Sequence, residues 1–199
     1  MTIANGRTAD HPVHELFLKR WSPRAYTGEP IPADTLSTIF EAARWAPSSY
    51  NSQPWRFLYA RRETDDWALF LGLLNTFNQS WAKHAAAIVF AISARTFVPP
   101  GGTEAVVSQT HSFDTGAAWS NLALQAALIG WDAHAFVGLD HDRAYRELAI
   151  PDTFRLEAGI AIGRRGDASL LPEALAARER PSDRLPLSEL VLEGRFQPA

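Results

Sequence analysis

The sequence contains no cysteine and only one methionine among its 199 residues. A chain without thiols has no disulfide, no thiolate metal ligand and no cysteine nucleophile. Any redox chemistry must therefore come from a bound cofactor. The lack of cysteine leaves the compartment open, and the cytoplasm is the default expectation.

Long apolar runs and a strong excess of one charge are also missing. The longest apolar run, 85–94, suits a buried strand and is too short to span a bilayer, and no signal peptide is visible. The formal net charge of −3 gives no overall reason to expect nucleic acid. The composition, 46% hydrophobic and 21% charged, is that of one globular domain over residues 1–199. We therefore expect neither nucleic acid nor a membrane as a partner.

Hydrophobic periodicity predicts helices and strands that alternate along the chain. Residues 1–10 are polar and are expected to form a loose arm. Helices are expected over 33–45, 63–74, 114–129 and 141–148, and strands over 55–60, 86–94, 132–138 and 154–164. The 86–94 segment is apolar at nearly every position, which is typical of a central strand covered on both faces. This order permits an antiparallel α+β fold and equally a doubly wound sheet.

The predicted helix 114–129 is the longest and ends before Gly130, a typical C-terminal cap. It carries two stripes, one of Ala117, Asn121, Leu124 and Leu128 and one of Ala118, Leu122, Gln125 and Ile129. A single core covers only part of such a helix. The second stripe indicates either a subunit interface or a helix at the centre of the domain.

The stretch from Ala46 to Trp55, Ala-Pro-Ser-Ser-Tyr-Asn-Ser-Gln-Pro-Trp, is unusually polar for a connection between a helix and a strand. Its two prolines prevent a regular hydrogen-bonded ladder, while its serine, asparagine and glutamine side chains offer both donors and acceptors. Such a loop suits a polar planar ligand. Taken alone, a turn that satisfies its own backbone groups is the more ordinary interpretation.

Upstream, the segment Arg20-Trp21-Ser22-Pro23-Arg24 places two guanidinium groups and a hydroxyl close together in the chain. This combination suits a phosphate and a second negative centre. Taken alone, the two arginines could equally offset the dipole of the preceding helix.

In their order and spacing, the two segments together resemble the FMN-dependent nitroreductase family, whose loop Pro-Ser-Ser-x-Asn-x-Gln-Pro-Trp is intact here from Pro47 to Trp55. The resemblance implies an α+β fold with a central, mainly antiparallel sheet flanked by helices. It further implies an intertwined homodimer with FMN at the interface. The long helix is then expected to pack against its twin, and residues 185–199 to form an extended tail to the other subunit.

The resemblance also implies a set of cofactor-binding residues: Arg20, Trp21, Ser22, Arg24, Pro47, Ser48, Ser49, Asn51, Gln53, Asn78, Val137, Gly138 and Arg184. Arg20, Ser22 and Arg184 are expected at the phosphate and ribityl chain. Arg24 is expected at the flavin N1/O2 edge, and a backbone N–H near Gly138 at flavin N5.

Three of these assignments carry an alternative or a departure from the family. Asn78 is expected at the pyrimidine edge of the flavin, or alternatively as a helix cap. Val137 stands where the family often has Glu. The family's second basic phosphate contact, commonly Lys, falls near Ser182, so Arg180 or Ser182 itself is the candidate.

The implied function is an FMN-dependent oxidoreductase that takes electrons from NADH or NADPH and passes them through flavin N5 to a small acceptor such as a nitroaromatic or quinone, in alternating turnover. Two alternatives stay open, namely a flavin-binding protein without turnover and a relative with dehalogenase-like or flavin-modifying activity. No catalytic side chain is certain, since the chemistry belongs to the flavin. The histidines lack metal-ligand spacing, so no metal site is expected.

Overall fold

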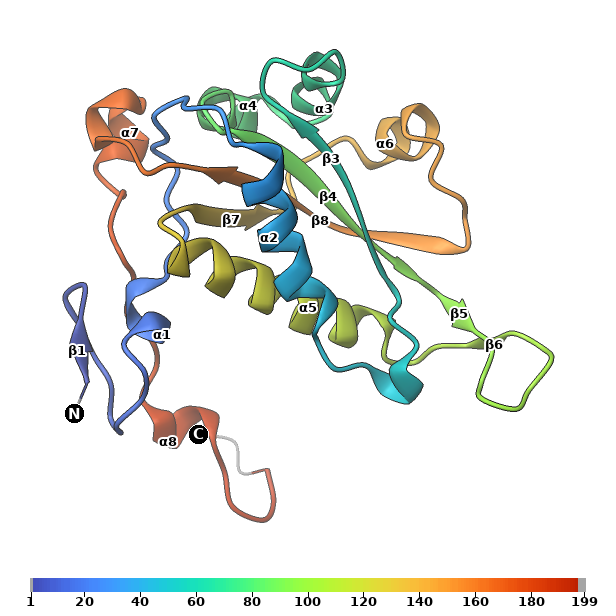
Figure 1. Ribbon diagram of the computed structural model, residues 1–199. Coiled ribbons are helices and arrows are strands. Elements are labelled where there is room, and N and C mark those ends of the chain that lie inside the picture. The colour runs from blue at the N-terminus through green and yellow to red at the C-terminus, as the bar shows by residue number, and fades with distance from the viewer. Residues whose placement is uncertain (1, 197–199) are drawn as a thin grey trace.

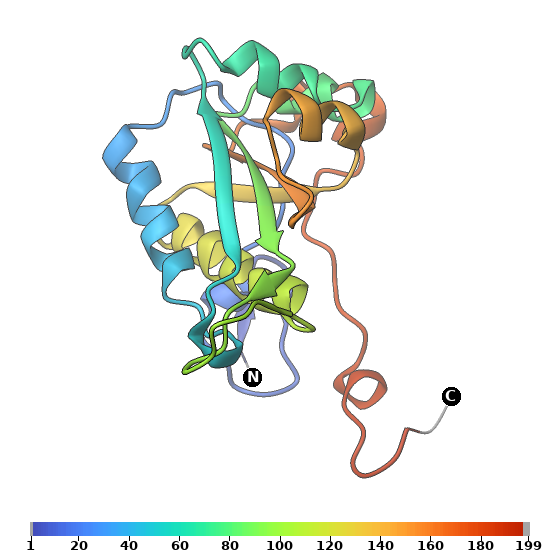
Figure 2. The ribbon, with the colours of Figure 1, turned by 90° about the vertical axis from the view of Figure 1, so that its right-hand side faces the viewer.

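The computed structural model describes residues 2–196 and is shown in Figures 1 and 2. Its centre is a four-stranded sheet in the order β3-β4-β8-β7. The strands are β3 (Trp55–Arg61), β4 (Ala87–Ala94), β7 (Asp132–Phe136) and β8 (Phe154–Gly163). Every pairing in this sheet is antiparallel. The predicted α+β class is therefore confirmed, and the doubly wound alternative is wrong.

Strand β4 is buried on both faces, as its apolar sequence predicts. Successive side chains of a strand point to opposite faces. Two separate cores result, with Ile88, Phe90 and Ile92 in one and Ala87, Val89 and Ala91 in the other. The sheet is thus the middle of three layers (Figure 2).

The helices divide between the two faces of the sheet. On one face, α2 (Ala33–Arg44) and α5 (His111–Leu128) supply the apolar side chains. On the other face lie α3 (Trp67–Gly72), α4 (Thr76–Ala82), α6 (His141–Glu147) and α7 (Glu173–Ala176). Figure 1 shows α2 in front of β7 and β8, and α5 running below β7.

The remaining elements are short. They are β1 (Ile3–Ala4), β2 (Arg7–Thr8), α1 (Leu16–Lys19), β5 (Thr96–Phe97), β6 (Val106–Val107), α8 (Leu187–Leu190) and 3-10 turns at Ser49–Asn51 and Ala168–Leu170. None of the helices within residues 2–196 is both long enough and apolar enough to cross a membrane.

The expected loose arm is wrong for the described part of residues 1–10, because β1 and β2 form an antiparallel hairpin. Its turn residues Asn5 and Gly6 have φ values of 57° and 72°. Asn-Gly is the strongest short signal for this kind of tight turn. The sequence therefore carried the information, although the flanking residues are too few to show a strand pattern.

The predicted helix over 63–74 is also wrong at its first turn. Glu63 has a φ of 69°, which no helical residue adopts, and α3 begins only at Trp67. The chain then forms α4 in the region that periodicity left unassigned. Two short helices joined by a turn therefore replace one longer helix.

Helix α5 begins three residues before its predicted start and ends at Leu128, where Gly130 follows with a φ of 78°. Ala118 and Leu122 are fully buried against the sheet. The other side is open in the single chain, since Phe113 is 82% exposed and Leu128 is 59% exposed. The helix thus lies at the domain surface with one apolar side uncovered.

Beyond α7 the chain leaves the sheet and extends away from the other elements (Figures 1 and 2). It contacts the N-terminal hairpin region, where the backbone N–H of Leu187 donates to Asp10 Oδ2 at 3.2 Å. Apolar side chains of this tail are exposed, including Leu185, Leu190 and Val191. The single chain therefore provides little cover for residues 185–196. Residues 197–199 of the predicted tail lie outside the described part of the chain.

Candidate functional site

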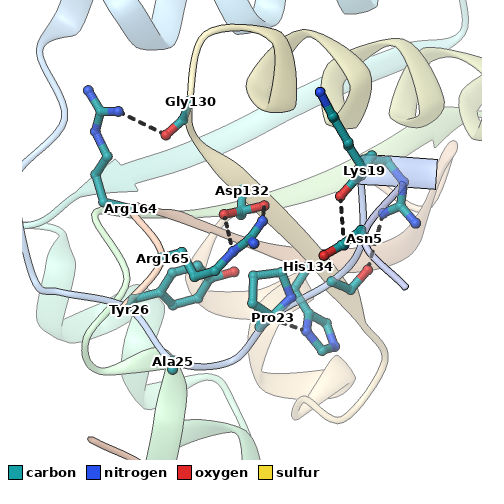
Figure 3. A network of polar contacts seen from close by, with 12 residues as sticks. Asn5, Lys19, Pro23, Ala25, Tyr26, Gly130, Asp132, His134, Arg164 and Arg165 are labelled. Atoms are coloured by element: carbon teal, nitrogen blue, oxygen red, sulfur yellow. Dashed lines mark hydrogen bonds and ion pairs between the residues drawn. The ribbon is translucent and has the colours of Figure 1, made fainter. Parts of the chain in front are cut away.

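The segment Arg20 to Arg24 leaves α1 in an extended conformation and passes beside β7. His134 on that strand points at it, with Nδ1 donating to the carbonyl oxygen of Pro23 at 3.0 Å (Figure 3). The His134 ring also packs against Trp81, with ring centroids 4.8 Å apart. The strand thereby fixes the middle of the arginine segment.

Burial lowers the pKa of His134 to about 4, and the nearby charges of Arg24 and Arg20 contribute to the shift. Hydrogen bonds to the carbonyls of Pro23 and Ser22 oppose it only in part. His134 is therefore neutral at neutral pH and adds no charge to the arginine segment.

Arg20 and Ser22 line a pocket of about 360 Å³. Its other walls are Phe17, Trp119, Ser120, Ala123, Leu124 and Ala135, mostly from α5. The guanidinium of Arg20 donates to Ser22 Oγ at 3.4 Å, and no ion pair within residues 2–196 includes it. The pocket therefore combines an apolar helix wall with an unpaired positive charge.

Arg24 is held through its backbone by a residue that sequence reasoning missed. The N–H groups of Arg24 and Ala25 both donate to Glu179 Oε1, at 2.6 and 2.8 Å. The Arg24 guanidinium lies 6.0 Å from the centre of the Trp81 ring, and its Nε is buried without a partner among the described residues. No local signal identifies Glu179, because it lies more than 150 positions away along the chain.

Asn78 connects α4 to the end of β7. Its side-chain amide donates to the carbonyl of Gly138 at 2.9 Å, while its oxygen accepts from Trp81 Nε1 at 3.2 Å. The helix cap is instead Asn75, whose side chain accepts from the Asn78 backbone N–H. The alternative that Asn78 caps the helix is therefore wrong.

Gly138 lies so close to these two amides that a side chain does not fit. A Cβ on Gly138 would lie 2.5 Å from Asn75 Nδ2 and 2.6 Å from Asn78 Nδ2. The preceding residue, Val137, is 72% exposed. The Asn75 and Asn78 amides thus fill the space beside Gly138, and an exposed apolar side chain precedes it in the chain.

Trp21 is buried, yet its indole Nε1 has no partner among the described residues. The guanidinium of Arg165 lies 5.2 Å from the Trp21 ring centre. Asp132 orients that guanidinium through hydrogen bonds of 2.8 and 3.1 Å (Figure 3). Trp21 is thereby fixed in place with an unused donor.

The loop from Pro47 to Gln53 is held at both ends. Gln53 N–H donates to Ser48 Oγ at 3.0 Å, and Ser49 N–H donates to Asp114 Oδ2 at 3.2 Å. Between them, Tyr50, Asn51 and Gln53 have φ values of 54°, 52° and 46°. Several left-handed non-glycine residues in one loop store backbone strain, which is concentrated at functional sites.

This loop and the Arg20 pocket meet α5 at different places. Ser49 contacts Asp114 in the first turn, whereas the pocket lies beside Trp119 to Leu124 and has none of the described loop residues in its lining. Within one chain, the structure therefore does not bring the two predicted halves of the site together.

Arg184, in the tail, lies near the arginine segment. It is exposed and its guanidinium donates to the carbonyls of Ser182 and Asp183 and to Ser182 Oγ. Its charge helps to lower the pKa of Arg20, after the larger effect of burial. The structure therefore brings Arg184 close enough to Arg20 for their charges to interact.

Comparisons with known proteins agree with this geometry. Residues 18–164 match the profile of the Nitroreductase family. A solved structure described as an oxidoreductase containing FMN is 51% identical and superposes with a TM-score of 0.95 over 99% of each chain. A nitroreductase family protein of Streptococcus pneumoniae shares the fold, with a TM-score of 0.71 and 22% identity over 90% of this chain and 98% of that one.

A shorter similarity connects this chain to an NADH dehydrogenase of Thermus thermophilus, at 50% identity over 44 residues, or 22% of each chain. The resemblance first identified in the Arg20 to Arg24 and Pro47 to Trp55 segments extends through the fold. This chain belongs to the Nitroreductase family.

Proposed function

We propose that this chain binds one non-covalent FMN and acts as an oxidoreductase. In this proposal, electrons pass from NADH or NADPH to a small acceptor such as a nitroaromatic or quinone, in two alternating half-reactions. The observation that carries the proposal is the unpaired Arg20 guanidinium beside Ser22 in a pocket of about 360 Å³. The cytoplasm, where both nicotinamides are available, is the proposed location.

The donors of the Arg20 to Arg24 segment fit an anionic flavin nucleotide. Trp21 Nε1 and Arg24 Nε are buried donors without partners among residues 2–196. Hydrogen-bond donors this deep are costly unless an acceptor reaches them. A phosphate and the carbonyl and ring nitrogen acceptors of a flavin are acceptors of the required kind.

Each side chain then has a distinct role. Bound FMN would accept a hydride from the nicotinamide and pass electrons on. Arg20, Ser22 and Arg184 bind the phosphate and ribityl chain, through charge-assisted hydrogen bonds. Arg24 would provide fixed positive charge at the flavin N1/O2 edge, where it would stabilise the anionic reduced flavin more than the neutral oxidised flavin. Asn78 would lie at the pyrimidine edge of the flavin, and its amide holds Gly138, whose neighbouring backbone N–H would face flavin N5.

The proposal includes a homodimer in which one chain completes the site of the other. Its support is the open side of α5, where Phe113 and Leu128 are exposed, together with the uncovered apolar tail. Large exposed apolar side chains on one helix and on an extended tail are candidates for an interaction surface. Pro47, Ser48, Ser49, Asn51 and Gln53 would then reach the partner's flavin. None of these loop residues lines the Arg20 pocket of its own chain, and Ser49 instead contacts Asp114, which supports this arrangement.

The test begins with the purified protein and its cofactor. The purified protein should be yellow, and heating it should release one equivalent of FMN per chain. Stopped-flow mixing with NADH or NADPH should then bleach the flavin, and a nitroaromatic or quinone should restore its colour. A colourless protein that ignores added FMN contradicts the binding.

The same experiment separates the alternative functions. A yellow protein that neither nicotinamide bleaches is a flavin-binding protein without turnover. A halogenated aromatic that restores colour while nitroaromatics and quinones do not would indicate the dehalogenase-like relative. A flavin that is itself altered after turnover would indicate flavin modification.

A further inference from the structure

Arg7, on strand β2 of the N-terminal hairpin, is an unusually buried arginine. It is 8% exposed, and its Nη1 donates to the carbonyl oxygens of Leu18 and Arg20, each at 3.0 Å. Its Nε is buried without a partner among residues 2–196, and no ion pair there includes it. Buried charges are normally paired, because an isolated one is costly to remove from water.

Arg7 shares its surroundings with two other arginines. Arg7 and Arg184 line the same cavity of about 630 Å³, between the hairpin and the tail. Burial lowers the pKa of Arg7, the charge of Arg184 lowers it further, and Asp183 only partly offsets these effects. Burial, Arg184 and Arg7 in turn lower the pKa of Arg20, and Asp132 opposes them in part. Within residues 2–196 none of these three guanidinium groups is in an ion pair, although Asp10 and Asp183 also line the cavity.

A purely structural role explains only part of this arrangement. The two carbonyls that Arg7 contacts stabilise the end of α1, but a neutral side chain could serve them too. They do not account for the unpaired Nε or for a positive charge placed beside two others. Ser182, next to Arg184, accepts a hydrogen bond from it and brings no charge. A bound dianion would remove the repulsion and satisfy the free donors.

We propose that Arg7 is a third phosphate-binding arginine, which acts with Arg20 and Arg184 on the phosphate of FMN. This inference rests on the proposed function, because it requires FMN as the cofactor. It assigns a binding role to the N-terminal hairpin. Arg7 would then take the place of the family's second basic phosphate contact, for which Arg180 and Ser182 were the candidates from the sequence. The geometry that carries the inference is the cavity shared with Arg184 and the direct contact with the backbone of Arg20. The Arg20 side chain lines the separate pocket of about 360 Å³, which has Phe17 in common with this cavity.

The test compares FMN with riboflavin, which lacks the phosphate, in fluorescence titrations of the apoprotein. Arg7→Gln should weaken FMN binding roughly ten- to a hundredfold and leave riboflavin within about twofold. Arg7→Lys, which keeps the charge but loses the planar fork, should fall between wild type and Arg7→Gln. Arg146→Gln, an exposed arginine on α6, is the matched control and should change neither affinity.

A double variant distinguishes direct binding from positioning. If Arg7 contacts the phosphate itself, Arg7→Gln added to Arg20→Ala should weaken FMN binding further. If the double variant binds FMN as Arg20→Ala does, Arg7 only positions Arg20 and the proposal is overturned.

The remaining outcomes are equally decisive. A wild-type protein that does not bind FMN, or binds it no better than riboflavin, contradicts the proposed function itself. If both Arg7 variants keep the wild-type preference for FMN over riboflavin, only the role of Arg7 is overturned. The same holds if the affinities for FMN and riboflavin fall equally. If Arg7→Gln does not fold by circular dichroism, Arg7→Lys decides alone through its FMN-to-riboflavin ratio. If Arg7→Gln weakens NADPH binding more than NADH binding and leaves FMN affinity unchanged, Arg7 belongs to the dinucleotide site and the proposal is overturned.

Discussion

The side-chain amide of Asn78 donates to the carbonyl oxygen of Gly138 at 2.9 Å, across 60 positions of sequence. The same side chain accepts from Trp81 Nε1, so α4 and the end of β7 are joined through one buried amide. Trp81 in turn packs against His134, which holds the arginine segment. A continuous set of contacts therefore runs from Gly138 to the proposed phosphate-binding residues.

The first prediction concerns the space at Gly138. Gly138→Ala places a Cβ within 2.6 Å of the Asn75 and Asn78 amides, so both amides must move. We expect a loss of about 1 to 3 kcal/mol in the free energy of unfolding, measured by urea denaturation, together with weaker FMN binding. Val137→Ala, at the exposed neighbouring position, is the control and should leave stability nearly unchanged. Equal stability of wild type and Gly138→Ala would show that the amides move freely.

The second prediction concerns pH. The pKa of His134 is about 4 when folded, below its ordinary value of 6.5, so the unfolded chain binds the proton first as pH falls. Stability is therefore complete above about pH 6.5 and decreases toward pH 4, by roughly 3 kcal/mol. Urea denaturation of the apoprotein across this range should show that slope. The His134→Asn variant should lack the part of this pH dependence that comes from His134. Identical pH profiles of stability for the wild type and the variant would refute the lowered pKa of His134.

Sequence patterns predicted the main elements because burial imposes strong periodicity on them. Strand β4 shows this best, since alternate residues fill the two cores. Helix α5 was also predicted, and of the two interpretations of its second stripe the structure excludes the domain centre, because that side is open. The boundary of α3 was wrong, because a left-handed Glu63 breaks a helical pattern without the glycine or proline that usually announces a break.

The candidate site was predictable only where its residues form compact local motifs. Arg20 to Arg24 and Pro47 to Trp55 are such motifs. Glu179, which binds the Arg24 backbone, and Arg7, which binds the Arg20 carbonyl, are not. Each depends on a contact between segments that are distant in sequence or on a hairpin too short to show periodicity. Tertiary structure alone brings these charges together.

The third prediction tests whether the loop of one chain serves the other chain's site. Arg20→Ala and the double variant Asn51→Ala/Gln53→Ala should each bind FMN weakly alone. Random mixing should make about half of the dimers mixed, each with one native site, so about a quarter of all sites should recover tight binding. An FMN titration of the mixed and re-equilibrated sample measures this fraction. Wild-type subunits mixed in the same way are the control, and no recovery would assign each loop to its own chain.

The fourth prediction concerns assembly. If the open side of α5 is the dimer interface, dilution of the FMN-bound protein should release FMN and separate the subunits over the same concentration range. Sedimentation velocity and flavin fluorescence can follow the two events. Phe113→Ser should shift both to higher protein concentration, because it removes exposed apolar surface from α5. A monomer at nanomolar concentration that keeps its FMN would be incompatible with a shared site.

The last prediction separates Arg20 from Arg24. If Arg20 binds the phosphate, Arg20→Ala removes a charge-assisted contact worth about 1.5 to 3 kcal/mol, so FMN affinity should fall roughly ten- to over a hundredfold. Its flavin midpoint potential should hardly change, because the phosphate is distant from the reacting ring.

Arg24 should behave in the opposite way. A positive charge at the N1/O2 edge stabilises reduced flavin more than oxidised flavin, so Arg24→Ala should lower the midpoint potential and slow reduction by the nicotinamide. Arg24→Lys should keep most of both properties, since a point charge suffices where bidentate geometry is not needed. Redox and FMN-binding titrations of each variant provide the measurement. An unchanged potential in Arg24→Ala would place Arg24 away from the flavin edge, where its contacts with Glu179 and Trp81 would be its whole role.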